Sequence, residues 1–175
     1  MLKLILGLKG SGKTKALIEM VNDASHASHG SVVCIEKGQK LIYDVKYKAR
    51  LVEADAYEID DAHALFGFIA GIAASDHDLS DVFVDSALKI CGNDVAAFTE
   101  FVEAVNALAT KIGFNCVMTS SIALEDVPES LMKYLYDIIL KPAVIFTVGF
   151  SRLPLFCIRW YRRRKPIFQG GTIYG

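Results

Sequence analysis

The sequence predicts an α/β fold of three layers, in which helices cover both faces of a mainly parallel central sheet. Short apolar runs of strand length alternate along the chain with longer segments whose apolar residues recur at helical spacing. Repeated strand and helix units of this kind form parallel sheets, because right-handed crossovers place the helices on the two faces. With 175 residues, 53% of them hydrophobic and 22% charged, the chain suits about one compact domain.

The first third of the chain supplies four predicted strands and one helix. Residues 2–6 predict a buried strand, and residues 13–24 predict a helix because their apolar side chains share one face. Residues 32–36 predict the second strand of the sheet. Residues 41–43 and 50–52 are predicted to form short strands at the edge of the sheet.

The middle of the chain adds a helix and a strand. Asp60 or Asp61 is expected to cap a helix that runs to about residue 74. Gly67 and Gly71 on that helix predict close packing against the sheet. The run DVFVD at residues 81–85 predicts a short strand that ends in an acid.

The remaining elements follow the same alternation. Asn93 is expected to cap the most regular helix of the chain, which Gly113 ends. Residues 114–121 predict another strand, and residues 138–146 predict a last one that Pro142 interrupts. Ligands of such folds gather at the carboxyl ends of the strands, so the residues just after each strand are the first candidates for function.

One of these strand ends carries a complete phosphate-binding motif. Residues 4–17 read LILGLKGSGKTKAL, which matches G-x-x-x-x-G-K-[ST] between a predicted strand and a predicted helix. In such a turn the backbone N–H groups converge on phosphate oxygens, the lysine reaches the β and γ phosphates, and the hydroxyl ligates magnesium. The residues expected to bind nucleotide are Gly7, Leu8, Lys9, Gly10, Ser11, Gly12, Lys13 and Thr14.

This stretch resembles the Walker A motif of the P-loop NTPases. The resemblance implies a P-loop NTPase fold that binds a nucleoside triphosphate, ATP, together with Mg²⁺. Asp85 lies where that family carries its Walker B acid, at the end of an apolar strand, and so is implied as a metal-binding residue opposite Thr14. Asp81 begins the same strand and is expected at the other edge of the sheet. The alternative for Asp85 is an acid that caps a loop.

The group that activates the attacking water is implied by the same resemblance. Many related ATPases carry a glutamate directly after the Walker B aspartate, but this chain has Ser86 there. In RecA-like ATPases the catalytic glutamate ends the strand after the P-loop helix, which is the position of Glu36. The implied catalytic set is therefore Lys13, Glu36 and Asp85, with Glu36 as general base or water-positioning group. The alternative for Glu36 is a solvated strand end paired with a neighbouring lysine.

Other residues bear on the nucleotide and its reaction. Thr119, Ser120 and Ser121 end the strand that should neighbour the Asp85 strand, where related ATPases sense the γ-phosphate; the alternative is that they only form a turn. The chain lacks the N-K-x-D motif of the P-loop GTPases, which favours ATP. Arg50 is the only arginine before residue 152, so an arginine finger must be Arg50 or come from the tail.

Charge divides the chain into two parts. Residues 138–175 carry seven lysines and arginines and no acid, whereas acids outnumber cations in residues 1–137. Residues 1–146 are predicted to form the nucleotide-binding domain, and residues 147–175 a basic, aromatic tail. The tail is expected either to contact anionic lipid or nucleic acid or to be a surface segment of little function. Arg152 and Pro154 interrupt its apolar run, so no transmembrane span is expected.

The four cysteines are far apart and form no C-x-x-C pair, so we expect buried free thiols and neither a zinc site nor a disulfide framework. The apolar run at the start is too short for a signal peptide, and a cytoplasmic location is the resulting expectation.

Three functions fit these observations. The first is a Mg²⁺-dependent ATPase of RecA-like type that acts on a protein partner or as a homo-oligomer. The chain resembles the small bacterial ATP-binding proteins named after the twitching-motility ATPases, without the acidic, histidine and arginine motifs of true pilus motors. The second is a nucleoside or nucleotide kinase, in which Asp85 or Glu36 takes the proton of the acceptor hydroxyl. The third is a non-catalytic nucleotide switch, which Ser86 in place of a glutamate favours.

Overall fold

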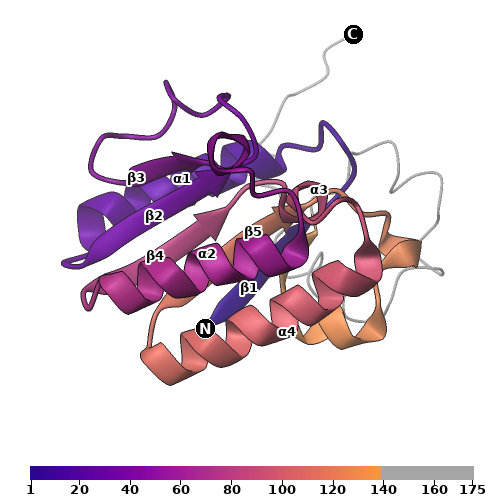
Figure 1. Cartoon of the computed structure of the whole chain (residues 1–175). Coiled ribbons are helices and arrows are strands. Elements are labelled where there is room, and N and C mark those ends of the chain that lie inside the picture. The colour runs from indigo at the N-terminus through magenta and orange to yellow at the C-terminus, as the bar shows by residue number, and fades with distance from the viewer. Residues whose placement is uncertain (139–175) are drawn as a thin grey trace, which may run out of the picture. The chain divides into compact units, whose positions relative to one another are not determined.

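Six parallel strands form a single sheet in the computed structural model, which describes residues 1–138 (Figure 1). The order across the sheet is β3-β2-β4-β5-β1-β6, and every pair of neighbours is parallel. The strands are β1 (Leu2–Leu6), β2 (Ser31–Glu36), β3 (Arg50–Glu53), β4 (Leu79–Val84), β5 (Asn115–Ser120) and β6 (Leu135–Ile138). The α/β class and the parallel sheet predicted from the sequence are confirmed.

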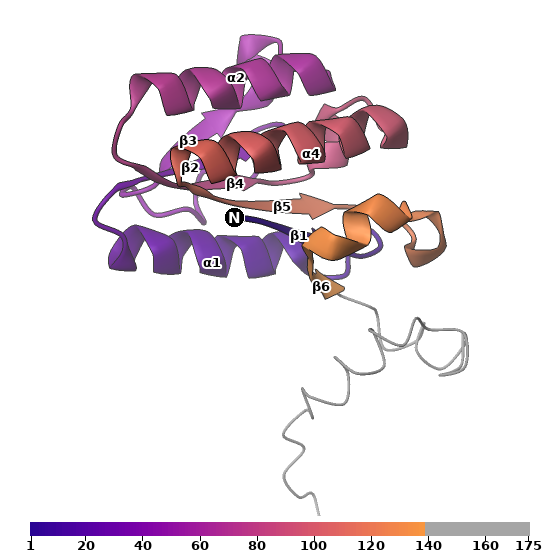
Figure 2. The ribbon, with the colours of Figure 1, turned by 90° about the horizontal axis from the view of Figure 1, so that it is seen from below.

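Helices cover both faces of this sheet. They are α1 (Lys13–Ala27), α2 (Ala62–Ser75), the single turn α3 (Ala87–Ile90) and α4 (Val95–Ile112), with 3₁₀ turns at Ala54–Tyr57, Leu124–Asp126 and Glu129–Tyr134. Figure 2 shows α1 on one face and α2 with α4 on the other. The arrangement is that of a three-layer α/β fold.

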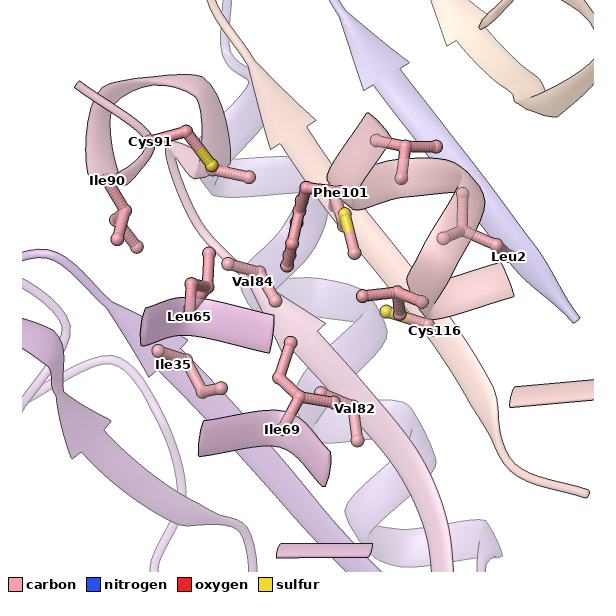
Figure 3. Close-up of a cluster of buried hydrophobic side chains, with 14 of the residues drawn as sticks. Leu2, Ile35, Leu65, Ile69, Val82, Val84, Ile90, Cys91, Phe101 and Cys116 are labelled. Carbon is pink, nitrogen blue, oxygen red and sulfur yellow. The ribbon is translucent and has the colours of Figure 1, made fainter. Parts of the chain in front are cut away.

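The core divides into two clusters, one on each face of the sheet. On the α1 face, Leu17 and Val21 pack against Ile5, Cys34 and Phe83. The larger cluster lies under α2 and α4, where side chains such as Leu65, Ile69 and Phe101 meet those of β2, β4 and β5 (Figure 3). Burial of a side chain of this size contributes about 1.5–3 kcal/mol, so these two faces hold the layers together.

Two predicted strands differ from the observed structure. Residues 41–43 form no strand, because the Leu41 N–H donates to the carboxylate of Glu36 instead of to a neighbouring strand. The last strand begins at Leu135, earlier than predicted, and pairs with β1. The rest of the predicted strand, from residue 139, and the whole tail lie outside the described residues. None of the helices that the structure describes could cross a membrane.

The cap of α4 is also corrected by one residue. Asp94, not Asn93, is the N-cap: its Oδ1 accepts hydrogen bonds from the N–H groups of Ala96 and Ala97 at 2.8 and 3.1 Å. Asn93 precedes it in the left-handed conformation, with φ of 62°. Asparagine is common both as an N-cap and in the left-handed conformation, so residue type alone did not show whether residue 93 or residue 94 is the cap.

The close packing predicted for Gly67 and Gly71 is wrong. A β-carbon built on either glycine would meet no atom within 4 Å. Both glycines line an open cleft of about 550 Å³ between α2 and the β2–β3 edge of the sheet. Their small size therefore leaves space on the surface and does not bring two backbones together.

The corrected cap makes a direct prediction about stability. We expect Asp94→Ala to lower the free energy of unfolding by about 1 kcal/mol, because two helix N–H groups lose their acceptor. Asn93→Gly is the matched control and should not destabilise the protein, since glycine accepts a positive φ. Urea unfolding measures both. A loss of stability in Asn93→Gly, with none in Asp94→Ala, would contradict the assignment of Asp94 as the N-cap.

Burial also predicts the behaviour of the thiols. Desolvation raises the pKa of Cys34, Cys91 and Cys116 from 9.0 to about 12, which lowers the thiolate fraction at pH 8 by roughly a thousandfold. In a Cys157→Ser variant we expect no rapid reaction with a thiol reagent until denaturant is added, when three thiols react. Rapid reaction of the folded variant would contradict the described core.

Candidate functional site

The glycine-rich turn between β1 and α1 uses backbone conformations that favour glycine. Gly10 and Gly12 lie at φ of 75° and 102°, where a side chain would be strained. The Ser11 N–H donates to the carbonyl of Leu8 at 3.1 Å and closes the turn, and α1 follows directly. The Ser11 hydroxyl is buried and has no hydrogen-bond partner among the described residues. The turn thus contains an unsatisfied polar group beside a helix N-terminus.

Lys13 folds back across this turn. It is buried, and its Nζ donates to the carbonyl of Leu8 at 2.9 Å. Burial lowers the pKa of Lys13, while the nearby charge of Asp85 raises it and opposes that effect. The ammonium group is therefore held over the turn by a single backbone acceptor.

A buried carboxylate gathers three hydroxyl groups next to this lysine. Thr14 Oγ1 and Thr119 Oγ1 both donate to Asp85 Oδ1, at 3.0 and 2.9 Å, and Ser86 Oγ donates to Asp85 Oδ2 at 2.9 Å. The Ser86 N–H in turn donates to Thr119 Oγ1 at 2.8 Å. Residues from three separate parts of the chain thus form one hydrogen-bonded cluster around Asp85.

The sheet explains why these residues meet. In strand order β5 lies between β1 and β4, so Thr119 ends up between the glycine-rich turn and Asp85. Val84 pairs with Met118, which puts Asp85 beside Thr119 at the carboxyl edge. Alternation along the strands directs both side chains to the α1 face, since Phe83 and Val117 two residues earlier belong to that cluster.

Glu36 ends the next strand along the same edge. Ile35 pairs with Val84, so Glu36 and Asp85 are neighbours. The Glu36 side chain is buried, and its two oxygens accept from the N–H groups of Lys40 and Leu41 at 2.9–3.2 Å. Burial raises the pKa of Glu36 and the charge of Asp85 adds to that, whereas the two amide donors lower it.

The alternative expected for Glu36, a solvated strand end paired with a lysine, differs from what is observed. Lys37 Nζ pairs with Asp55 at 3.7 Å instead. Arg50 is not brought to this edge, since it begins β3 at the opposite end of the sheet and lines the cleft beside α2. Asp81 likewise lies at the amino edge, where Asn115 donates to it.

The cluster offers oxygen ligands for a hard cation, although no group of three acidic, histidine or cysteine side chains suited to a metal occurs within residues 1–138. A protein-bound Mg²⁺ typically keeps several waters and phosphate oxygens and needs only one or two protein oxygens. Thr14 Oγ1 and the Asp85 carboxylate are such a pair.

The sequence assigned no function to Ser86, and the structure gives it two contacts in the cluster. It adopts the left-handed conformation, with φ of 57°, which turns its N–H toward Thr119 while its hydroxyl stays on Asp85. The sequence shows a hydroxyl residue directly after the acid, and this was the available signal. It does not show the left-handed backbone conformation of that residue.

Comparison with protein-family models finds none that matches this chain, and comparison with curated proteins finds no significant match. The function is therefore inferred from the geometry of the site.

The Asp85 cluster predicts a stability effect. Thr119→Val should lower the free energy of unfolding by about 1–3 kcal/mol, because the Ser86 N–H loses its acceptor and Asp85 loses a buried donor. Thr110→Val is the matched control, since that hydroxyl bonds only within an exposed part of α4. Equal stability of the two variants in urea unfolding would contradict the cluster.

Proposed function

We propose that this chain binds ATP with Mg²⁺ on its glycine-rich turn and hydrolyses it, as a P-loop ATPase of RecA-like type. The observation that carries the proposal is the contact between Thr14 Oγ1 and Asp85 Oδ1 at 3.0 Å. The two residues belong to separate sequence motifs, 71 positions apart. A magnesium-binding pair requires that proximity, and an accidental glycine turn does not.

The chemistry of the turn suits triphosphate. Left-handed glycines, a helix N-terminus and a lysine ammonium converge there, and each of them favours phosphate oxygens. The Ser11 hydroxyl lacks a partner among residues 1–138 and would gain one from a phosphate oxygen. Lys13 would exchange its single carbonyl acceptor for a charged one, which makes a stronger hydrogen bond.

The residues present also suit magnesium. Thr14 and Asp85 would hold it, directly or through water, and Ser86 and Thr119 keep the Asp85 carboxylate oriented. When bound, Mg²⁺ would withdraw charge from the phosphate oxygens. Thr119 ends the strand between β1 and β4, and we propose it as the polar group that responds to the terminal phosphate, through its hydrogen bond to Asp85.

Glu36 is the proposed base. A carboxylate offers about four lone-pair sites, so the two amides of Lys40 and Leu41 leave acceptor capacity on it for a hydrogen bond from water. Its raised pKa, caused mainly by burial, brings it closer to the range in which a base works at neutral pH. Hydrolysis then requires that Glu36 accept the proton of the water that attacks the γ-phosphorus.

A second function, a nucleotide switch without hydrolysis, is favoured by one observation. Both oxygens of Glu36 are engaged by the backbone of the following loop, and the position after Asp85 holds a serine. If Glu36 serves only to hold that loop, no residue of the site, within residues 1–138, activates water. Bound ATP would then alter the protein surface without being hydrolysed.

Labelled ATP distinguishes these functions. We expect the full chain to bind Mg²⁺-ATP and to release phosphate slowly. Lys13→Ala should abolish both, because the turn loses the lysine that reaches the phosphates. Glu36→Gln should retain binding and lose about 10²–10⁴-fold in turnover. Lys15→Ala is the matched control, since this exposed lysine two residues along α1 should not affect either quantity.

Other results would redirect or overturn the proposal. Tight binding without phosphate release would support the switch. Phosphorylation of an added nucleoside would support a kinase. Full turnover in Glu36→Gln, with none in Lys13→Ala, would exclude Glu36 as the base. The absence of any Mg²⁺-ATP binding would overturn the proposed function.

A further inference from the structure

The segment between β2 and β3 differs in composition from the rest of the domain. Residues 37–49, with Arg50, carry five cations and a single acid, Asp44, while acids outnumber cations in the rest of residues 1–137. Tyr43 and Tyr47 lie within this segment, four residues apart, and are 95% and 93% exposed. We call residues 37–49 the basic-aromatic loop; its cations and that of β3 are Lys37, Lys40, Lys46, Lys48 and Arg50.

The basic-aromatic loop is anchored in the fold at several points. Leu41 and Ala49 are buried in the core of the α1 face. Asn22 of α1 holds the middle of the loop, since its Nδ2 donates to the Asp44 carbonyl at 3.0 Å and its Oδ1 accepts from the Lys46 N–H at 2.9 Å. Glu36 holds its beginning. The two tyrosines, together with Ile42, which is 52% exposed, therefore lie on the outside of a loop that the fold holds in place through Leu41 and Ala49.

Most cations of the loop are exposed and are not paired with acids. Lys37 is paired with Asp55, but Lys40, Lys46, Lys48 and Arg50 are exposed and form no salt bridge with any acid of residues 1–138. Lys46 Nζ instead approaches His26 Nε2 at 3.0 Å. Unpaired cations beside exposed aromatic rings attract an anionic partner that also has flat faces.

The loop meets the cleft beside α2 at Lys48. Lys48 and Arg50 line it together with Tyr57 and Phe68, whose ring centroids are 5.6 Å apart. Gly67 and Gly71 leave its wall open. Two cations outnumber the one acid of its lining, Asp76, and an aromatic pair forms part of its wall, so the hollow suits a base with its attached phosphate.

We propose that the basic-aromatic loop and this cleft bind single-stranded nucleic acid. The exposed cations contact phosphates, and Tyr43 and Tyr47 stack on successive bases, which is how sequence-independent single-strand binders combine charge and aromatic faces. An acidic protein would satisfy the lysines but would leave both tyrosine rings without a stacking partner. This binding does not depend on the proposed ATPase activity, so either can fail alone.

Fluorescence anisotropy of a labelled oligo(dT) of about 20 nucleotides with the full chain tests the proposal. We expect binding that weakens steeply between about 50 and 200 mM salt. Tyr43→Ala with Tyr47→Ala should weaken it at least about tenfold, because two aromatic faces that stack on bases are lost. Lys46→Ser with Lys48→Ser should reduce the slope of log affinity against log salt by about 0.7 for each phosphate that is no longer neutralised.

Matched controls distinguish binding by the loop from binding by other surface charges and from binding by the tail. Tyr136→Ala removes another exposed tyrosine, and Lys89→Ser with Lys111→Ser removes two exposed lysines elsewhere; both should bind as the wild type does. The proposal is overturned if oligo(dT) does not bind, or if only replacement of Arg162, Arg163 and Arg164 in the tail abolishes binding. It is also overturned if labelled polyglutamate binds as tightly through the same loop residues, which would indicate an acidic protein partner.

Discussion

Parallel pairing of β1, β5 and β4 holds three strand ends side by side, and the arrangement of the candidate site depends on it. Because all strands run in one direction, their carboxyl ends share one edge, and the residues that follow them meet there. The glycine-rich turn, Thr119 and Asp85 are far apart in the sequence but adjacent at this edge. An antiparallel neighbour would have directed one of these groups to the opposite end of the sheet.

Asp85 is the polar centre of that edge. A buried carboxylate is costly unless its oxygens are bonded, and here three hydroxyl donors and the nearby Lys13 ammonium offset that cost. The donors come from α1, β5 and the turn after β4. The carboxylate therefore links the N-terminus of α1 to the sheet, and it fixes the orientation of the Thr14 hydroxyl.

Glu36 joins the candidate nucleotide site to the basic-aromatic loop. Glu36 lies beside Asp85 in the candidate site, and its hydrogen bonds from the N–H groups of Lys40 and Leu41 hold the beginning of the loop. Asn22 connects the same loop to α1, the helix that begins at the glycine-rich turn. The loop is thus connected to the region of the glycine-rich turn by two short sets of contacts, one through Glu36 at the end of β2 and one through Asn22 of α1.

The sequence by itself determined the elements whose signals are local: the strand–helix alternation, the glycine-rich turn with Lys13 and Thr14, and the acid at the end of DVFVD. It also indicated that the Thr119 strand should neighbour the Asp85 strand. Tertiary structure alone decided that residues 41–43 form no strand, with Leu41 donating to Glu36, that Gly67 and Gly71 open onto a cleft, and that Ser86 binds Asp85. Periodicity and motifs report on residues within a few turns of one another, whereas the partner of a buried polar group depends on which distant segment the fold places beside it.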